Sequence, residues 1–391
     1  MAVAVAVALA LGAAEPKSSG PTVTFDAAWA AALRPGETAR LPTGRYAGPW
    51  RIGRGVRLVA RPGATLTADP AGRPTLSLTG DGLEIDGLTV EGPDGGIAIA
   101  AERCRGLALR EVRILGGRRG LEAHGGSLSW RGGGASGSVE FGVWSQDARI
   151  ALAALDLQPR AGTGLFVAGG DARVVGVSFA GGDYGVLLQR TVLDLRASRF
   201  GASRLAGLAI VRSRGRVLGC RFVGPYGEAA ITAIAAEPLR LTRNVVSAAG
   251  AMGVKLVNSV GALEGNVIAG ARTDAHGLEG DGLYLFESRV VSHGDKLSDL
   301  GGNGVVVLGG SARLHGCRIE GVGDAAAFVD EGGRLELAGC TIERARLALF
   351  VDPSAWAQER GCHLSEIGRD GGGGKSGTRS RVDIGVDHGD R

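Results

Sequence analysis

The sequence is poor in the residues that build metal and disulfide sites. It has 5 Cys, 6 His and 5% aromatic residues in 391 positions. The cysteines are odd in number and no pair has C-x-x-C spacing, so neither a disulfide framework nor a zinc site is expected. The motifs H-E-x-x-H, G-x-S-x-G, N-x-[ST] and the phosphate-binding loop are absent, and with them the usual sequence signs of metalloproteases, serine hydrolases and P-loop enzymes.

Long hydrophobic runs are missing too, apart from one at the start. Residues 1–14, MAVAVAVALALGAA, have the length of a secretory signal core and are too short to span a bilayer. The run ends in small residues, so we predict a signal peptide over 1–14 and a secreted, periplasmic or cell-surface protein without a membrane span. No Lys or Arg precedes the run, and a buried or frayed N-terminus is the alternative.

What the sequence has in excess is glycine between short apolar runs. It contains 69 Gly and 44% hydrophobic residues, which indicates many tight turns between short strands. The net charge is +4, and with no recognition motif this argues against nucleic acid as a partner. Arginine recurs beside one set of apolar positions; we interpret this as ordinary solvation of an outward sheet, with a basic stripe for a polyanion as the alternative.

The chain repeats itself with a period near 22 residues. One marker is a Gly followed by an apolar-x-apolar strand, at Gly96, Gly120, Gly142, Gly164, Gly185, Gly207, Gly253, Gly282 and Gly304. A second marker ends in an apolar residue, at Val90, Ile114, Leu157, Phe179, Phe200, Phe222, Val246, Ile268, Leu297, Ile319 and Ile342. No window sustains helical periodicity, so each repeat is one coil of a β-solenoid whose equivalent strands stack in parallel. The same phase stacks Asn244, Asn266 and Asp295 in an inward ladder, where Asp295 can accept a hydrogen bond from Asn266.

With these repeats the chain resembles the right-handed parallel β-helix proteins of the pectate lyase-like superfamily. The resemblance implies an all-β, single-stranded β-helix of about twelve coils over residues 22–352. Residues 22–60 resemble the N-terminal cap of that family, with a short helix from Asp26 to Leu33. Residues 353–391 lose the period and are expected to form an irregular, Gly-rich tail.

The outward positions of the Gly-anchored strand are mostly apolar. They include Trp144, Phe166 and Tyr284, which can form an aromatic platform for sugar rings, with Lys296 as a further substrate contact. The alternative is that loops, or the C-terminal segment around PSAWAQERGCHL, cover this face, because long exposed apolar strips are rare on monomers.

One insertion interrupts the 22-residue period. The spacing between Gly253 and Gly282 is 29, which is seven residues too long, and the extra residues are RTDAHGLEGDG. Asp274, Glu279 and Asp281 are candidate ligands of Ca²⁺, which needs several oxygen ligands. Neighbouring coils supply the remaining candidates for catalysis, so that the predicted catalytic set is Lys255, His276, Asp281 and His293.

Two classes of function remain open from the sequence. The resemblance implies an exported protein that binds an acidic polysaccharide and modifies it by lyase, epimerase or hydrolase chemistry. The alternative is a noncatalytic envelope or extracellular protein that binds glycan or protein along its length. No Arg stands in the strand columns beside the insertion, which departs from the lyase pattern, and an acid-and-Gly stretch is also the ordinary composition of a surface loop.

Overall fold

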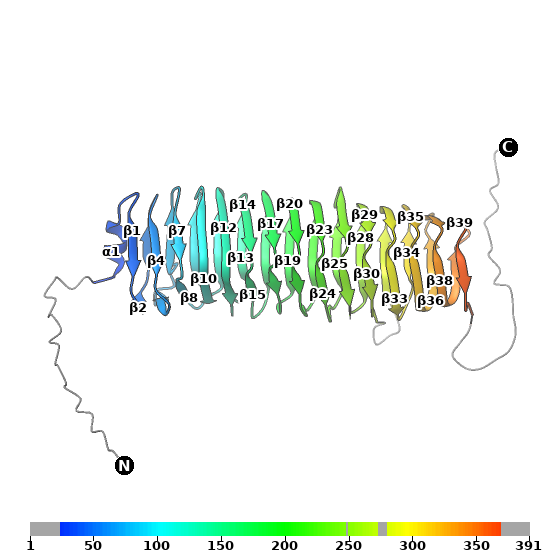
Figure 1. Cartoon of the computed structure of the whole chain (residues 1–391), viewed down its shortest axis with the longest axis horizontal. Coiled ribbons are helices and arrows are strands. Elements are labelled where there is room, and N and C mark those ends of the chain that lie inside the picture. The colour runs from blue at the N-terminus through cyan, green and yellow to red at the C-terminus, as the bar shows by residue number, and fades with distance from the viewer. Residues whose placement is uncertain (1–23, 248, 273–279, 369–391) are drawn as a thin grey trace, which may run out of the picture.

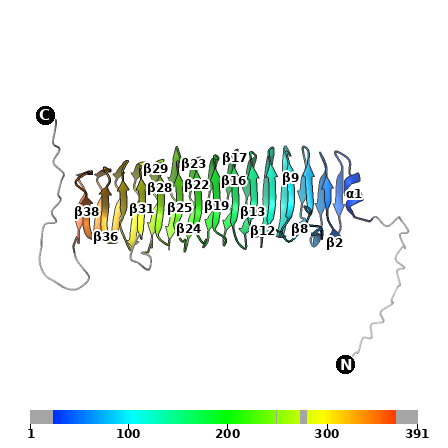
Figure 2. The ribbon, with the colours of Figure 1, turned by 180° about the vertical axis from the view of Figure 1, so that it is seen from behind.

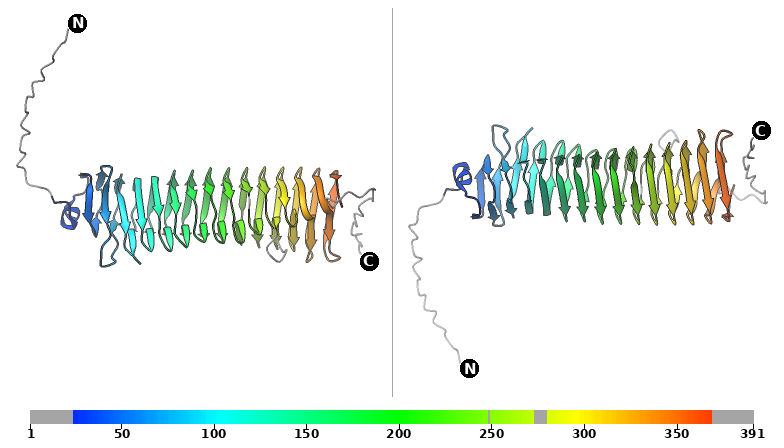
Figure 3. Two further views of the ribbon diagram at one scale, coloured as in Figure 1. Left: turned by 90° about the horizontal axis from the view of Figure 1, so that it is seen from below. Right: turned by 90° about the horizontal axis from the view of Figure 1, so that it is seen from above.

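The protein is a parallel β-helix. The computed structural model describes residues 24–247, 249–272 and 280–368. In these residues the chain winds through about 15 turns with a period near 22, and three parallel sheets run along the axis. The coils stack into a straight rod with α1 (Ala27–Ala32) at one end and β39 at the other (Figures 1 and 3). All strand pairs between consecutive coils are parallel, as the repeat predicted.

The three sheets are named here in chain order. Sheet A contains β1 (Thr38–Leu41), β4 (Arg57–Ala60), β7 (Glu84–Asp86), the first part of β10 (Leu107–Gly116) and of β12 (Ser127–Ser136), β14 (Arg149–Ala153), β17 (Asp171–Val175), β20 (Val192–Arg196), β23 (Arg214–Leu218), β26 (Leu239–Thr242), β29 (Val260–Glu264), β32 (Arg289–His293), β35 (Ser311–His315), β37 (Arg334–Ala338) and β39 (Trp356–Arg360). Sheet B contains β2 (Gly44–Ala47), β5 (Ala64–Thr67), β8 (Thr89–Gly92), the second part of β10 and of β12, β15 (Asp156–Gln158), β18 (Ser178–Phe179), β21 (Arg199–Phe200), β24 (Arg221–Val223), β27 (Val245–Ser247), β30 (Val267–Ala269), β33 (Lys296–Leu300), the first part of β36 (Arg318–Asp330) and of β38 (Thr341–Val351), and β40 (His363–Ser365).

Sheet C carries the Gly-anchored strands and is seen best from behind (Figure 2). It contains β3 (Trp50–Ile52), β6 (Leu76–Thr79), β9 (Ile97–Glu102), β11 (Arg119–His124), β13 (Phe141–Gln146), β16 (Thr163–Ala168), β19 (Tyr184–Gln189), β22 (Ala206–Val211), β25 (Ala229–Ile234), β28 (Met252–Val257), β31 (Asp281–Phe286), β34 (Val305–Leu308) and the second part of β36 and of β38.

The core is built from identical positions of successive coils. Phe179, Phe200 and Phe222 are in register, fully buried and stacked, with ring centroids 4.9 and 4.4 Å apart. Every apolar residue of the second sequence marker is buried in the same way, which confirms its phase. Because each coil buries its apolar side chains against both neighbours, the hydrophobic contribution to folding is spread along the rod.

The marker glycines lie where two backbones approach too closely for a side chain. A Cβ at Gly120 would stand 2.5 Å from the carbonyl oxygen of Gly142 in the next coil. The phase of one marker was wrong: Leu121 pairs with Ile99, so the residue equivalent to Gly120 is Ala98 and not Gly96.

A polar ladder turns the corner between sheets A and B in the C-terminal half. Asn244 Nδ2 donates to Asn266 Oδ1 at 3.0 Å, and Asn266 Nδ2 donates to Asp295 Oδ1 at 2.8 Å, as predicted. The hydroxyl of Ser292 donates to the other oxygen of Asp295. Burial raises the pKa of Asp295, and these donors act against that rise. The ladder satisfies its own polar groups, so it is a structural element.

The coils begin within the predicted region and extend beyond its C-terminal end. At the N-terminal end, Asp26 caps α1 by accepting from Trp29 N at 2.8 Å, and α1 covers the first coils. The predicted count of about twelve coils was too low, because the first coils lack the Gly marker. At the other end, β39 and β40 continue sheets A and B past residue 352, each pairing in register with the previous coil. The segment PSAWAQERGCHL therefore belongs to sheets A and B, and the expectation that this segment covers sheet C was wrong.

Candidate functional site

Charged and aromatic side chains gather on the outward face of sheet C over β11, β13 and β16. The register aligns Glu122 with Trp144 and Trp144 with Phe166, so the three side chains form one column along the axis. A parallel column aligns Arg119 with Phe141. We call this group, together with two further members, the Trp144 patch: Arg119, Glu122, His124, Glu140, Phe141, Trp144 and Phe166.

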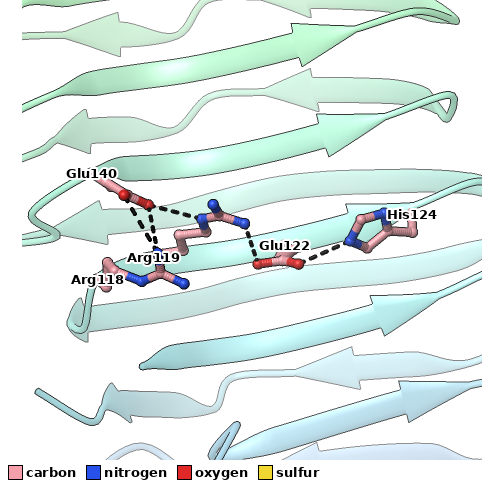
Figure 4. A network of polar contacts seen from close by, with 5 residues as sticks. All are labelled: Arg118, Arg119, Glu122, His124 and Glu140. Atoms are coloured by element: carbon pink, nitrogen blue, oxygen red, sulfur yellow. Dashed lines mark hydrogen bonds and ion pairs between the residues drawn. The ribbon is translucent and has the colours of Figure 1, made fainter. Parts of the chain in front are cut away.

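A continuous set of ion pairs crosses the patch (Figure 4). Arg119 Nη1 lies 2.9 Å from Glu122 Oε2, and Arg119 Nε lies 3.0 Å from Glu140 Oε2. The other oxygen of Glu122 is 2.9 Å from His124 Nε2. Arg118 approaches Glu140 from the neighbouring turn at 3.4 Å. The side chains of Arg119 and Glu122 are 20% and 13% exposed, so this pairing is partly shielded from solvent.

The ion pairs change the acidity of Arg119. Burial by itself lowers its pKa, and the hydrogen bonds to Glu122 and Glu140 outweigh burial, so the pKa of Arg119 is raised overall. The guanidinium therefore stays charged and holds both carboxylates in place.

Aromatic rings surround this guanidinium. Its central carbon lies 5.0 Å from the ring centroid of Trp144 and 5.6 Å from that of Phe141, within the range of cation–π contacts. Trp144 and Phe166 are stacked at 6.3 Å with an interplanar angle of 23°. His124 packs edge-on against Trp144 at 4.7 Å. The patch thus combines nearly parallel apolar ring surfaces with fixed donors and acceptors, which is the composition of a site that orients a polar ligand.

A second polar group lies farther along the same sheet. Lys255 belongs to the column of Trp144, five coils on, which at about 4.8 Å per coil is about 24 Å away. Its Nζ is 2.9 Å from Glu228 Oε1 and 5.9 Å from the ring centroid of Tyr284. We call Glu228, Lys255, Asp281, Tyr284 and Asn303 the Lys255 cluster.

Asp281 has well-defined partners within this cluster. It is 6% exposed, and its Oδ1 accepts from Asn303 N at 2.7 Å and from Asn303 Nδ2 at 3.0 Å. Burial raises the pKa of Asp281, and the two bonds from Asn303 act against that rise. The carboxylate at this position therefore already has both of the hydrogen bonds that a buried acceptor oxygen needs.

Two other predicted site residues, His293 and Lys296, lie on other sheets than these two groups. His293 is on sheet A, where it stacks on His315 at 4.9 Å, and Lys296 is on sheet B, paired with Glu320 at 2.6 Å. Asp274, Glu279 and His276 lie outside the described residues. Within the described ranges no three His, Cys, Asp or Glu side chains are arranged to hold a metal ion.

Arg119, Glu140 and Phe141 did not figure in the sequence prediction. Strict alternation from the marker Gly turns the preceding residue inward, but β11 has two consecutive buried residues, Gly120 and Leu121, so Arg119 points outward as Glu122 does. The signal that could have found them is the side chain just before the marker, which is Arg or Phe in two successive coils.

No family model matches the chain, and no curated protein matches it in sequence. Among solved structures it is similar to a PL6 alginate lyase in complex with a trisaccharide (11% identity, 81% of each chain covered, TM-score 0.41). It is also similar to tailspike protein 3 of bacteriophage CBA120 (12% identity, 83% of this chain and 56% of the tailspike, TM-score 0.46). A third is the A-module of mannuronan C-5 epimerase AlgE4 from Azotobacter vinelandii (11% identity, 85% of this chain and 87% of the epimerase module covered, TM-score 0.35).

These identities and TM-scores identify no substrate. The parallel β-helix is established by the strand pairing itself, and it is the architecture that the resemblance to the pectate lyase-like superfamily implied. In the part of the chain that is described, no helix has the length and apolar character needed to cross a membrane.

Proposed function

We propose that the protein binds a polysaccharide along sheet C and that the Trp144 patch is the main contact. The observation that carries this proposal is the pair of outward, nearly parallel rings of Trp144 and Phe166 beside a preformed ion-pair network. Sugar rings present apolar faces and hydroxyl rims, and the rings and charged groups of the patch are complementary to these two features respectively. The Lys255 cluster, with Lys255 and Tyr284, would be a second contact for a long polymer.

An acidic polymer is the ligand class that the sequence predicted. The patch together with the adjacent Arg118 is balanced in charge, because Arg118 and Arg119 face Glu122 and Glu140. An acidic ligand therefore needs cations outside the patch. Ca²⁺ remains a prediction in which Asp281 would supply one carboxylate and further oxygen ligands would have to come from elsewhere.

Proton transfer is a second candidate function, favoured by one observation. Glu122 holds His124 at 2.9 Å, and a carboxylate that orients a histidine is the arrangement a general base requires. A base at this position could remove the proton next to a uronate carboxylate, the step that lyases and epimerases share. His276, His293 and Lys255 are the alternative bases predicted from the sequence.

Glycan binding by Trp144→Ala tests the main proposal. Isothermal titration against glycans selected on an array should show affinity reduced about tenfold or more, because a central aromatic contact is lost. Phe350→Ala is the matched control, since Phe350 is 41% exposed at the far end of sheet C. Equal affinity of Trp144→Ala and the natural protein, or no binding to any glycan, would contradict the proposal. The enzyme candidate requires turnover that His124→Gln abolishes while glycan binding persists.

Export is part of the same proposal. Its support is the apolar run over residues 1–14, which lies outside the described residues. Determination of the N-terminal sequence of protein recovered outside the cytoplasm checks it. A mature chain that begins at residue 15 is expected, and a chain that retains the run would contradict a cleaved signal.

A further inference from the structure

The positive charge of the protein is concentrated in the middle of the rod. Residues 190–243 contain ten Arg, no Lys and three acidic residues, a net charge of +7. The whole chain has a net charge of +4, so the remainder is net negative. Three of the ten are paired: Arg196 and Arg216 with Asp194, and Arg204 with Asp183. The other seven, which we call the arginine band, are Arg190, Arg199, Arg212, Arg214, Arg221, Arg240 and Arg243.

All seven side chains of the band are exposed, and within the described residues none forms an ion pair. The register stacks like charges in consecutive coils: Arg199 pairs with Arg221, and Arg216 pairs with Arg240. Arg190 and Arg212 occupy the same turn in consecutive coils, both with φ near 50°. Coils are about 4.8 Å apart, and at that distance like charges repel.

Like charges are in register elsewhere too, at Arg110 with Arg131 and Lys296 with Arg318, but several positions outside this segment carry opposite charges in consecutive coils. Arg57 pairs in register with Glu84, Arg149 with Asp171 and Arg313 with Glu336, and each pair forms an ion pair of 3.3–3.4 Å. The fold therefore accommodates cross-coil pairing on its outward faces. Over residues 190–243 one such in-register pair is described, between Asp194 and Arg216, and seven of the ten arginines there have no acidic partner among the described residues.

The band curves around the rod. Arg190 and Arg212 lie at the turn between sheets C and A, Arg214 and Arg240 lie on sheet A, and Arg243 lies at the corner that leads to sheet B. Arg199 and Arg221 lie on sheet B. A flat bilayer cannot meet sheet A, sheet B and the corners beside them at once, whereas a flexible polymer can. Single-stranded nucleic acid is disfavoured because it needs exposed stacking rings, and the aromatic residues of this segment, Phe200, Phe222 and Tyr226, are buried.

We infer that the arginine band is a binding site for an anionic polysaccharide, one that carries carboxylate or sulfate groups. Guanidinium groups bind such groups through two parallel hydrogen bonds, and a polyanion would relieve the repulsion between stacked arginines. The inference rests on the proposed function for the choice of a polysaccharide over other polyanions. It also supplies the cations that the charge-balanced Trp144 patch lacks. The coil of β19, which ends next to Arg190, directly follows the coil of Phe166, so one chain can reach both sites.

Titrations with polygalacturonate, dextran sulfate and neutral dextran test the inference. They are run at about 20, 100 and 300 mM NaCl, because salt over this range progressively screens interactions between exposed charges. The natural protein should bind both polyanions in a salt-dependent way. The triple variant Arg214→Gln, Arg221→Gln, Arg240→Gln should bind them about tenfold more weakly. The matched control, Arg57→Gln, Arg149→Gln, Arg313→Gln, removes the same charge from paired positions and should change affinity less than about twofold.

Thermal unfolding separates the two triple variants further. The band variant should keep or raise the melting temperature, because it relieves repulsion, whereas the control should lower it slightly. Equal weakening by both variants, or no binding of either polyanion at 100 mM NaCl, would overturn the inference. So would band-dependent binding to phosphatidylserine vesicles or to a single-stranded oligonucleotide that is tighter than binding to the polyanions. Trp144→Ala distinguishes the two proposals. If Trp144→Ala loses polyanion binding and the band variant keeps it, the inference about the arginine band fails while the proposed function stands.

Discussion

The Trp144 patch and the Lys255 cluster lie on the same sheet and differ in how their charges are satisfied. In the patch, Arg119 joins Glu122 of its own coil to Glu140 of the next coil at the surface, beside outward rings. In the cluster, Asp281 is buried and both of its close partners belong to Asn303. A charged group that a sequence singles out can therefore be part of the scaffold, while the surface suited to a ligand lies elsewhere on the face.

The largest expected effect is that of Asp281→Ala on stability. The change leaves the backbone N–H and the side-chain amide of Asn303 without their acceptor, which costs about 1–3 kcal/mol of the free energy of unfolding. Asp281→Asn keeps an oxygen in place and should cost less. Urea denaturation of the two variants measures the difference.

The same two variants test whether Asp281 belongs to the scaffold. If Asp281→Ala leaves the free energy of unfolding unchanged and abolishes glycan binding, Asp281 belongs to a ligand site and not to the scaffold. Affinity for the glycan that the Trp144 patch binds should otherwise stay within about twofold of the natural protein, since Asp281 lies several coils away.

In the patch the expected effect is on binding. Glu122→Ala removes the carboxylate that holds both Arg119 and His124, so glycan affinity should fall about fivefold through loss of preorganisation. Glu140→Ala is the control, because Arg119 keeps its bond to Glu122 and the fall should be smaller. Titration calorimetry measures both. Natural affinity in Glu122→Ala would show that the network stabilises the fold without shaping a binding surface.

The fold was largely predictable from the sequence because each coil of a solenoid requires the same residue types at the same positions. Gly142 and Phe179 each recur in equivalent positions of neighbouring coils, so the period, the inward phase and the Asn266–Asp295 bond followed from spacing alone. The first coils and the last coil were missed because their markers differ from the consensus. For the same reason the marker of one coil was placed at Gly96, two residues before the equivalent position, Ala98.

The site was less predictable because it depends on which side chains point outward. The alternation that identifies the core residues fails at Arg119, because two successive buried residues, Gly120 and Leu121, follow it. The insertion attracted the prediction because it interrupts the period, yet His293 and Lys296 turned out to lie on two other sheets. Each coil contributes to three sheets that face in different directions. Residues that are close in the sequence can therefore lie on different faces of the rod.

The pH dependence of stability tests whether Asp281 is a buried scaffold group. The folded-state pKa of Asp281 is raised by burial above its ordinary value of 3.8, so its stabilising contribution is complete below that value and is lost as pH rises through the folded pKa. The free energy of unfolding of the natural protein, relative to Asp281→Asn, should therefore increase as pH falls from 7 toward 4. Urea denaturation at several pH values measures it, and a relative free energy that decreases would contradict the assignment of burial as the cause.

The smallest expected effect is that of Lys255→Met. Its ion pair with Glu228 is partly exposed, and such pairs contribute about 0–1 kcal/mol, so stability should change little. If a long glycan spans both groups, its affinity should fall about twofold to threefold through loss of the distal contact. A short fragment that covers only the Trp144 patch should bind as before. Equal effects on the long and the short ligand would show that the two groups do not share one ligand, because a distal contact can act only on a chain long enough to reach it.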